Sequence, residues 1–483
     1  MMTTPIIDFI EKYKKSGAVR LHMPGHKGVG ALGFESADIT EIDGADSLYE
    51  AHGIIRESEE NASALFGCPT FYSAEGSSLA IRAMLYLAVL AAREEDPASP
   101  PLVFAARNCH KTFVSAAALL DIDVRWLYPE AGGNYLSCTV TPQALDAALA
   151  AAERKPAAVY ITSPDYLGNI ADVAGLAAVC HRSGTLLLVD NAHGAYLRFL
   201  PVSRHPVDLG ADACCDSAHK TLPVLTGGAY LHISRNAPAV FCAGARRALA
   251  LFGSTSPSYL ILQSLDAANR ELAGGFPARL GDMAERTASL GKSLAAHGFT
   301  LTGDEPMKLT IAARPWGYTG EGLARALYDA GIVPEFYDPD YLVMMVSPSN
   351  SAADISRLGE ALMSIPRRRA EDIIREIKKL YDTDIPIFAI CLGHQLMALA
   401  TGASTYKLKY GHRGGNHPVK DLRTNKVYIS SQNHGYVVDT DKMDPKVAIP
   451  AFVNVNDSTN EGLEYIGKNI FTVQFHPEAC PGP

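Results

Sequence analysis

Two ionisable residues in this 483-residue chain stand just after apolar runs that read as neighbouring strands. Asp190 follows the run that closes at Val189, and Lys220 follows the run 213–215. The carboxyl ends of parallel strands meet at one edge of a sheet, where ligands bind. Pyridoxal phosphate catalysis needs a lysine amine for the Schiff base and a buried carboxylate that keeps the pyridine nitrogen protonated. The spacing predicts that both side chains reach one such cofactor.

A third polar stretch brings hydroxyl groups to the start of a helix. Residues 73–78 join a short predicted strand to a long predicted helix, which opens at Gly76, Ser77 and Ser78. Free N–H groups at a helix start, together with hydroxyls, bind dianionic phosphate. The stretch therefore predicts a binding site for the cofactor phosphate.

Each of these features also has a purely structural explanation. An aspartate after a strand is usually a turn or N-cap residue, a single lysine is usually a solvated charge, and a serine-rich stretch is an ordinary helix start. Their occurrence together and in this order favours the cofactor site, because three unrelated explanations would otherwise all have to hold.

Alternating helical and apolar segments form the frame that would hold these residues. Helices are predicted at Ser58–Phe66, Ser77–Arg93, Thr112–Leu120, Pro142–Glu153 and Val173–Ser183. Strands are predicted at Leu102–Ala105, Val124–Leu127, Ala157–Ile161, Thr185–Val189, Ala213–Cys215 and Ala229–Ile233. Strands that are apolar throughout and alternate with helices indicate a parallel sheet covered on both faces.

Two further segments follow this frame. The first has helices at Ser258–Leu272, Arg279–His297, Glu321–Ala330 and Ala352–Met363, with strands at Lys308–Ala312 and Tyr341–Val346. The second opens with an amphipathic helix whose stripe is Ile373, Ile374, Ile377 and Leu380, and continues as a strand–helix unit and a β-rich tail. We expect an α/β protein with an N-terminal arm (1–55), a large domain with a mostly parallel sheet (56–250), a small α+β domain (251–365) and a further α/β segment (366–483).

Seven stretches within residues 1–365 resemble the Orn/Lys/Arg decarboxylase family. They are LHMPGHKG, EIDGADSLYEAHGIIRESEENASALFG, SAEGSSLAIRAML, RNCHKT, DNAHGAYLRF, DSAHKTLPVLTGGAYL and STSPSY. Members of this family are fold-type I pyridoxal-phosphate enzymes. The resemblance therefore implies that fold, that cofactor, and release of CO2 from lysine, ornithine or arginine to give the amine.

The same resemblance implies roles for individual residues. Lys220 would form the Schiff base, Asp190 would hold the pyridine nitrogen, and His110 would stack on the cofactor face. His193 would sit by the ring as a hydrogen-bonding or proton-shuttling group, and the phosphate would be held by Ser77, Ser78, Ser217 and His219. Thr255, with Ser256, resembles a segment that reaches the phosphate of a neighbouring subunit, which implies a homodimer or larger homo-oligomer. Two structural alternatives stay open: His219 capping its own turn, and His110 as a core histidine.

Substrate and reaction stay less defined. Glu41, Asp43, Asp46 and Glu50 are candidates to meet the basic end of the substrate, and solvated surface charge is the alternative for each. Cofactor anchoring does not choose which bond at Cα breaks, so aminotransfer remains an alternative. Family members usually continue into a further C-terminal domain, whereas unrelated sequence begins near Pro366 here.

A second group of reactive residues lies in that unrelated sequence. Cys391 ends a predicted strand at a helix start, and the small residues Ala389 and Gly393 permit the sharp turn of a nucleophile elbow. A helix N-terminus favours the thiolate. His476 and Glu478 follow a later strand, and Cys–His–Glu is a triad for acyl transfer. A buried structural thiol is the alternative for Cys391.

Residues 369–483 resemble the glutamine-hydrolysing small subunit of carbamoyl-phosphate synthetase, a class I glutamine amidotransferase. The matching stretches are AICLGHQLMALATGA, YKLKYGHRGGNHPV, YISSQNHGYVVD and VQFHPEACPGP. The resemblance implies the triad Cys391, His476 and Glu478, and glutamine contacts from Leu392, Gln395, Asn433, Gly435 and Tyr436. It also makes a synthetase large subunit a candidate partner.

The amidotransferase pattern is incomplete. We find no glycine-rich NGPGDP-type loop upstream of Cys391, where decarboxylase-like sequence stands instead. Loss of one oxyanion donor costs about 10²–10³ in rate, so we predict little or no glutaminase activity. Missing core strands would also leave apolar surface uncovered. An accidental junction of two gene fragments fits these two partial patterns better than a functional fusion.

Composition narrows the class of protein further. The chain has 43 Lys and Arg against 52 Asp and Glu, a net charge of −9, which disfavours a nucleic-acid binder. The most apolar stretch, Ala83–Ala92, is shorter than the roughly 20 residues of a membrane span, and the N-terminus lacks signal-peptide order. Nine scattered cysteines without a C-x-x-C pair predict reduced thiols, no structural metal site and a cytoplasmic enzyme.

Overall fold

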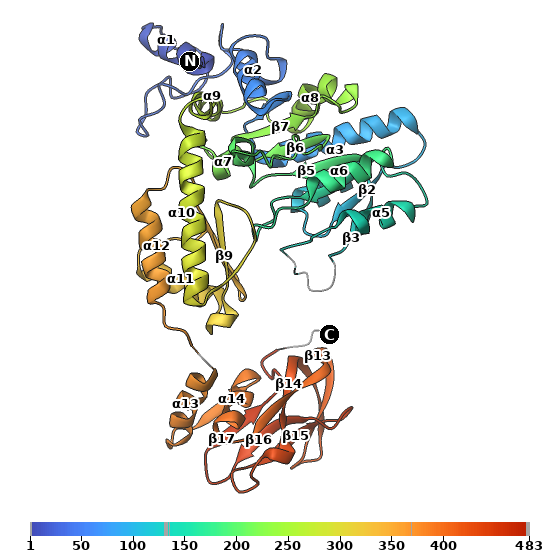
Figure 1. Ribbon diagram of the computed structural model, residues 1–483, viewed down its shortest axis with the longest axis vertical. Coiled ribbons are helices and arrows are strands. Elements are labelled where there is room, and N and C mark those ends of the chain that lie inside the picture. Colours follow the sequence, from blue (N-terminus) through green and yellow to red (C-terminus); the bar gives the residue numbers. More distant parts are fainter. Residues whose placement is uncertain (1, 130–133, 135, 369, 480–483) are drawn as a thin grey trace. The chain divides into compact units, whose positions relative to one another are not determined.

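The computed structural model describes residues 2–129, 134, 136–368 and 370–479. These form two compact units, Met1–Ile365 and Pro366–Pro483 (Figure 1). Each unit has its own sheets and its own core.

The first unit contains a seven-stranded sheet in the order β1-β7-β6-β5-β4-β2-β3. Its strands are β1 (Thr70–Ser73), β2 (Leu102–Ala106), β3 (Asp123–Leu127), β4 (Ala158–Thr162), β5 (Leu186–Asp190), β6 (Ala213–Asp216) and β7 (Ala229–Ile233). Most neighbours are parallel, as predicted, but β7 is antiparallel to both β1 and β6. The link from β6 to β7 contains only the one-turn helix α7 (Ala218–Thr221), which does not cross the sheet face, so the chain returns in the opposite direction.

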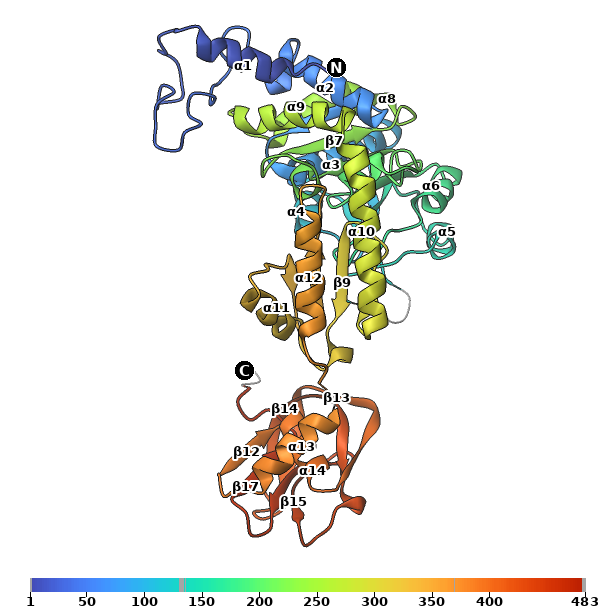
Figure 2. The same cartoon turned by 60° about the vertical axis from the view of Figure 1, so that its left-hand side comes forward.

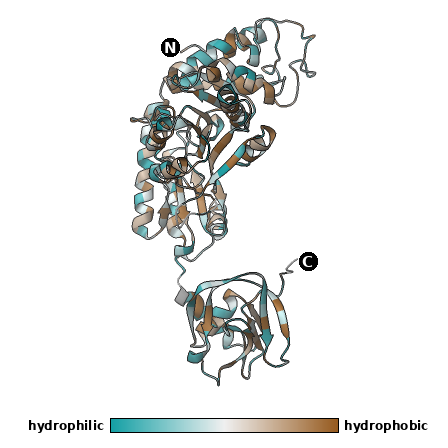
Figure 3. Cartoon of the chain, turned by 90° about the vertical axis from the view of Figure 1, so that its right-hand side faces the viewer, coloured by the Kyte–Doolittle hydropathy of each residue, from teal (hydrophilic) through white to brown (hydrophobic). Residues whose placement is uncertain are grey.

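Alternate residues along each strand enter two separate cores. Val103 and Ala105 of β2 pack with the helices α3 (Gly76–Glu95), α4 (Lys111–Leu119) and α8 (Ala239–Phe252). Phe104 and Ala106 pack on the other face with α5 (Pro142–Ala150) and α6 (Val173–Arg182). Helices therefore cover both faces, which explains the uniformly apolar strands, drawn mainly in brown in Figure 3.

Helix α3 is long and apolar enough, by length and composition, to cross a membrane. Most of its residues from Leu79 to Val89 lie in the core of the large sheet, packed against the strands and α8. The apolar character of α3 is therefore accounted for by its place at the centre of this core.

A four-stranded antiparallel sheet, in the order β10-β11-β9-β8, forms the smaller part of the first unit. Its strands are β8 (Thr300–Thr302), β9 (Lys308–Ala312), β10 (Phe336–Tyr337) and β11 (Tyr341–Met345). The helices around it are α9 (Tyr259–Ala273), α10 (Phe276–His297), α11 (Gly320–Asp329) and α12 (Ala352–Ser364). The predicted helices all occur, although α10 begins earlier than expected because Pro277 is tolerated in its first turn.

The N-terminal segment has little regular structure. It contains α1 (Pro5–Lys15), a 3-10 turn (Leu48–Glu50) and α2 (Ile54–Phe66). The chain between α1 and that turn is an extended loop (Figure 2), in which Val19, Leu21 and Val29 are at least four-fifths exposed.

The second unit contains a six-stranded sheet in the order β12-β17-β16-β15-β13-β14. Its elements are α13 (Ala370–Tyr381), β12 (Ile387–Ile390), α14 (Leu392–Ala400), β13 (Ser404–Asp421), β14 (Val427–Asp439), β15 (Ala448–Asn454), β16 (Asn460–Tyr465) and β17 (Ile470–Val473). Among the strands described in this unit, only β12 and β17 are a parallel pair. Of the predicted stripe on α13, Ile377 packs on the core whereas Leu380 is exposed.

Candidate active site

A cavity of about 530 Å³ opens at the carboxyl edge of the large sheet. All of the predicted cofactor residues except Thr255 line it: Ser77, Ser78, His110, Asp190, His193, Ser217, His219 and Lys220. Asp190 is the last residue of β5, and Lys220 lies in the one-turn helix that follows β6. Because β5 and β6 are parallel neighbours, their carboxyl ends bring the two residues to one cavity, as the spacing predicts.

Asp190 is a buried carboxylate held by neutral donors. Its oxygens accept hydrogen bonds from the hydroxyl of Tyr160 at 3.2 Å and the backbone N–H of Ala192 at 3.2 Å. The thiol of Cys215 donates to it at 3.7 Å. Burial raises the pKa of Asp190, while the nearby Lys220 opposes that rise. A cation placed in the cavity would therefore meet a fixed carboxylate that lacks a bonded counter-charge.

The amine of Lys220 is hydrogen-bonded to His193 rather than to a carboxylate. The Nζ of Lys220 lies 3.1 Å from the Nε2 of His193. Burial lowers the pKa of Lys220, and burial together with neighbouring cations holds the pKa of His193 well below its ordinary value. The pair therefore favours an uncharged imidazole and an amine that gives up its proton readily.

Hydroxyl groups gather around the start of α3, where this helix lines the cavity. The hydroxyl of Ser217 donates to that of Ser77 at 2.8 Å, and that of Thr112 donates to Ser78 at 3.2 Å. Gly76 opens the helix at φ +72°, a conformation that glycine adopts without strain. Gly76, Ser77 and Ser78 at the start of α3 line the cavity, and a helix start of this kind binds an anion well.

His110 and His219 each make a structural hydrogen bond to the backbone and also line the cavity. The Nδ1 of His110 accepts from the backbone N–H of Thr112 and so caps α4. The Nδ1 of His219 lies 3.0 Å from the carbonyl oxygen of Gly228. Both rings nevertheless line the cavity, so each side chain is fixed by its backbone partner and presents its remaining edge to the site. His110 is exposed there and is not a core histidine.

Several residues of the site were not found from the sequence. Tyr160 and Cys215 lie inside apolar strands, where neither shows a polar pattern. Tyr166 packs edge-on against His193, with ring centroids 5.3 Å apart. Lys308, the first residue of β9, lies 3.5 Å from the Nδ1 of His193 and is far from it in the chain. A lysine that begins a buried strand was the one signal available for it.

The four acidic residues predicted to meet the substrate and the loop 254–256 do not line the cavity. Thr255 and Ser256 are exposed and do not line the cavity, although the N–H of Ser254 bonds to Glu75 next to α3. Glu41, Asp43, Asp46 and Glu50 do not line it either. Burial acts to raise the pKa of Asp46, but backbone N–H groups led by that of His52 outweigh it and lower the pKa, so Asp46 anchors the loop before α2.

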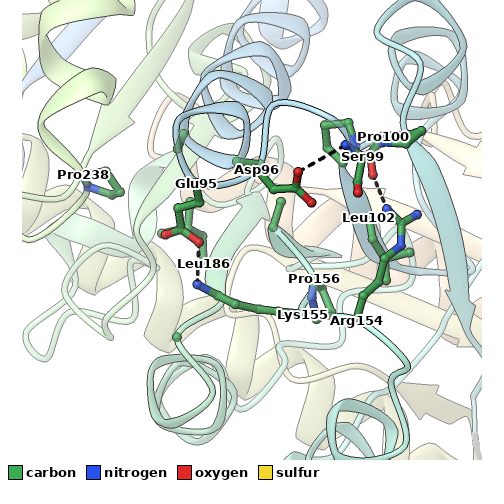
Figure 4. A pocket seen from close by; sticks show the side chains of 15 residues that line it. Glu95, Asp96, Ser99, Pro100, Leu102, Arg154, Lys155, Pro156, Leu186 and Pro238 are labelled. Carbon is green, nitrogen blue, oxygen red and sulfur yellow. Dashed lines mark hydrogen bonds and ion pairs between the residues drawn. The ribbon is translucent and has the colours of Figure 1, made fainter.

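A second, smaller hollow of about 290 Å³ lies at the amino ends of β2, β4 and β5. Figure 4 shows its polar rim, where Lys155 pairs with Glu95 at 2.9 Å and Arg154 bonds to the carbonyl oxygen of Pro100. The hollow is at the edge of the sheet opposite to Lys220, so it has no part in the site described above.

Cys391 of the second unit has the geometry of a nucleophile elbow. It lies between β12 and α14 at φ +51° and ψ −106°, a strained conformation for a non-glycine residue. Its sulfur contacts the side-chain amide of Gln474 at 3.6 Å. Burial raises the pKa of its thiol, and the N–H of Leu392 lowers it less. The expected gain in thiolate character at the helix start is therefore outweighed.

The other triad residues lie at the same edge, because β17 runs parallel to β12. The Nδ1 of His476 is 2.8 Å from Glu478. Within the described part of this unit, no hydrogen bond joins His476 to Cys391.

Of the predicted glutamine contacts, Gln395 donates to the carbonyl oxygen of Tyr436 at 2.9 Å. Asn433 pairs with Arg413 across β13 and β14, Gly435 lies on the same strand, and Leu392 is 60% exposed.

Comparison with known proteins agrees with this geometry. Residues 4–283, more than half of the chain, match the family model "Orn/Lys/Arg decarboxylase, major domain". The chain belongs to the Orn/Lys/Arg decarboxylase family. Its first unit has the fold-type I architecture of pyridoxal-phosphate enzymes.

Solved structures of this fold include lysine decarboxylases. The enzyme from Francisella novicida has a TM-score of 0.64 and 17% identity, covering 89% of this chain and 74% of that one. Lysine decarboxylase A from Pseudomonas aeruginosa has a TM-score of 0.62 and 20% identity, covering 79% of this chain and 60% of that one. At these identities the likeness establishes the fold of this family member.

Residues 362–483 match a second family model, "Glutamine amidotransferase class-I". The segment is similar to the carbamoyl phosphate synthase small chain of Methanocaldococcus jannaschii, with 48% identity over 147 residues, which is 30% of this chain and 36% of that protein. The small chain of Symbiobacterium thermophilum is 59% identical over 100 residues, 21% and 27% of the two chains. The decarboxylase-family chain thus spans about a third of the length of these relatives.

Proposed function

We propose that the first unit is a pyridoxal-phosphate-dependent decarboxylase of a basic amino acid, acting on lysine, ornithine or arginine to give the amine and CO2. The observation that carries the proposal is the convergence of Asp190, Lys220 and a cluster of hydroxyl groups on one cavity. Membership of the decarboxylase family supports the choice of reaction.

The residues of the cavity fit this cofactor. The buried carboxylate of Asp190, bonded only to neutral donors, suits a protonated ring nitrogen. The hydroxyls of Ser77, Ser78 and Ser217 and the start of α3 suit a phosphate dianion. Lys220 lines the same cavity and has a lowered pKa, which suits covalent attachment of an aldehyde.

When bound, the cofactor withdraws electrons from the substrate Cα. The residues of this chain hold the reacting groups around it. Asp190 keeps the ring charge in place, and His110 would cover one face of the ring. His193 would hold or move a proton at the Nζ of Lys220, which it contacts. His219, fixed by Gly228, would complete the phosphate site.

Borohydride reduction tests the attachment directly. The purified full chain is incubated with pyridoxal phosphate, reduced, digested and mapped by mass spectrometry. We expect the cofactor to be fixed to Lys220, and we expect the unreduced protein to release CO2 from one of lysine, ornithine or arginine. Labelling of other lysines with Lys220 unmodified would refute the site, and labelling of Lys220 without CO2 release would refute the reaction.

Aminotransfer at the same site is the alternative within enzymes, because the anchoring residues serve either reaction. Conversion of the bound cofactor to its amine form, dependent on a keto acid, would favour it. Release of CO2 without that conversion rejects it.

We also propose the domain division given by the sequence, 1–55, 56–250, 251–365 and 366–483, a cytoplasmic location, and a homodimer or larger homo-oligomer. Support for the oligomer comes from the exposed loop at Thr255, which is tied to the phosphate end of α3 through Ser254 and Glu75. A Thr255→Ala variant mixed with a Lys220→Ala variant tests it. Activity recovered in mixed oligomers indicates that Thr255 serves the neighbouring site.

For the second unit we propose little or no glutaminase activity. In the described residues, Cys391 is bonded to Gln474 rather than to His476, and its thiol pKa is raised. Release of ammonia from glutamine that disappears in a Cys391→Ala variant would overturn this proposal. The alternative role, as a glutamine-handling subunit of a synthetase, requires co-purification with a synthetase large subunit.

A further inference from the structure

Lys308 enters the candidate site from the small four-stranded sheet. It is the first residue of β9, and its side chain is 1% exposed. Its Nζ pairs with the equally buried carboxylate of Glu305 at 2.7 Å and donates to the carbonyl oxygen of Asp165 at 3.2 Å. A carboxylate at that distance keeps a buried amine charged, so Lys308 is an ammonium group held in one position.

His193 lies between this ammonium group and Lys220. Its Nδ1 is 3.5 Å from the Nζ of Lys308, and its Nε2 is 3.1 Å from the Nζ of Lys220. The ring is 5% exposed and is packed edge-on by Tyr166. Each nitrogen of the ring therefore has a lysine as its partner.

A neutral imidazole has one acceptor nitrogen and one N–H donor. Two ammonium groups, which only donate, would need two acceptor nitrogens, so Lys308 and Lys220 cannot both be charged while both are bonded to His193. Lys308 has its own carboxylate partner in Glu305. Lys220 has no carboxylate within ion-pair distance in the described residues. Lys220 is therefore the one whose amine accepts a hydrogen bond from the N–H of the ring.

We propose that Lys308 is a positioning residue, which binds the Nδ1 of His193 and so directs the Nε2–H of His193 to the Nζ of Lys220. The amine of Lys220 is then held in its neutral form, and it attacks an aldehyde when its lone pair leaves this hydrogen bond. This inference rests on the proposed role of Lys220.

Four further titratable groups act on Lys220 and His193 from other segments, besides the thiol of Cys215 in β6. Asp190 at the end of β5 and Glu335 before β10 favour a charged Lys220, whereas His110 and His219 oppose a charged His193. None of these four is bonded to either nitrogen of His193. Lys308 is thus the group that selects the tautomer.

Nitrogen NMR of the full chain without cofactor tests the tautomer. Histidines are labelled with 15N, and the His193 signals are identified by their loss in a His193→Gln variant. We expect the wild type to show a protonated Nε2 and an unprotonated Nδ1. A wild-type protein with Nδ1 protonated would overturn the proposal.

Two variants separate the role of Lys308 from its contribution to folding. Lys308→Met removes the donor, and the double variant Glu305→Gln with Lys308→Met also removes the carboxylate that would be left unpaired. We expect the tautomer ratio of His193 to shift about tenfold toward Nδ1–H in each folded variant, as for the loss of one hydrogen bond. Lys155→Met, an exposed paired lysine, is the matched control and should leave the ratio unchanged. An unchanged ratio in the double variant would overturn the proposal.

Acetylation of Lys220 by acetic anhydride gives a second readout, because only the neutral amine reacts. We expect Lys220 to react about tenfold more slowly at pH 7 in the double variant than in the wild type, corresponding to about one pH unit. Equal rates would contradict the proposal. Neither readout involves the cofactor, so failure of cofactor attachment and failure of this inference give different results.

Discussion

Replacing Asp190 with asparagine isolates the charge that the site offers to the ring nitrogen. The change keeps the size of the side chain and its acceptor oxygen for Tyr160 or Ala192. It removes a carboxylate that is 2% exposed and that is bonded in the described site only to neutral groups. The lost contact is therefore one hydrogen bond from a charged donor in a water-poor environment.

A hydrogen bond to a charged group contributes about 1.5–3 kcal/mol. At 1.4 kcal/mol per factor of ten, we expect the affinity for pyridoxal phosphate to fall about 10- to 150-fold in Asp190→Asn. Absorbance titration of the cofactor-free chain measures the affinity, and circular dichroism confirms the fold. Asp146→Asn is the control, because Asp146 is an exposed aspartate paired with Arg182. Affinity within threefold of the wild type would refute the assignment of Asp190 to the ring nitrogen.

Four further predictions concern stability and the two sites. Asp216 is fully buried and accepts hydrogen bonds from Asn191, His205 and His232. Asp216→Ala should therefore lower the free energy of unfolding in urea by about 3–5 kcal/mol. The control, a change at the exposed Asp146, should lower it by about 0.5 kcal/mol or less. Burial acts to raise the pKa of Asp216, but the two histidines outweigh it and lower the pKa. The stabilisation from Asp216 should therefore be complete above the unfolded-state pKa near 4 and be lost as pH falls further; a wild-type urea midpoint that does not change between pH 5 and pH 3 would contradict this. Ser217→Ala should weaken binding of inorganic phosphate to the cofactor-free chain several-fold by calorimetry, and unchanged binding would remove Ser217 from the phosphate site. Cys391→Ala should leave ammonia release from glutamine at the background rate of the wild type, and a decrease would show that the second unit is active.

The sequence predicted the frame of the large domain because that frame is set by local patterns. Strands buried on both faces are mostly apolar, and β2, β4 and β5 are so up to the polar residue that ends β4 and β5. The direction of β7 was missed, because the pattern of an apolar strand is the same in either direction. Only the length and course of the link through α7 decide it.

The site was predicted to the extent that its residues follow strand ends. Asp190, Lys220 and Ser77 occupy such positions, and all three line the cavity. Lys308 and Tyr160 lie within strands and reach the site through the packing of β9 and β4. The sequence could not show the contact of Lys308, since it depends on how the small sheet packs against the large one. The contacts of Tyr160 and of Asp216 depend on which strands and loops of the large sheet become neighbours; the histidine partners of Asp216 come from a loop and from β7.

Strand β12 stands at the end of the six-stranded sheet and is bonded to β17 alone in the described residues. Its sequence, IFAI, has no charge and no proline, and Phe388 is 56% exposed. Such an edge presents free backbone N–H and C=O groups to any other extended chain. The second unit therefore carries a backbone edge on which another extended segment, such as β12 of a second copy, can pair.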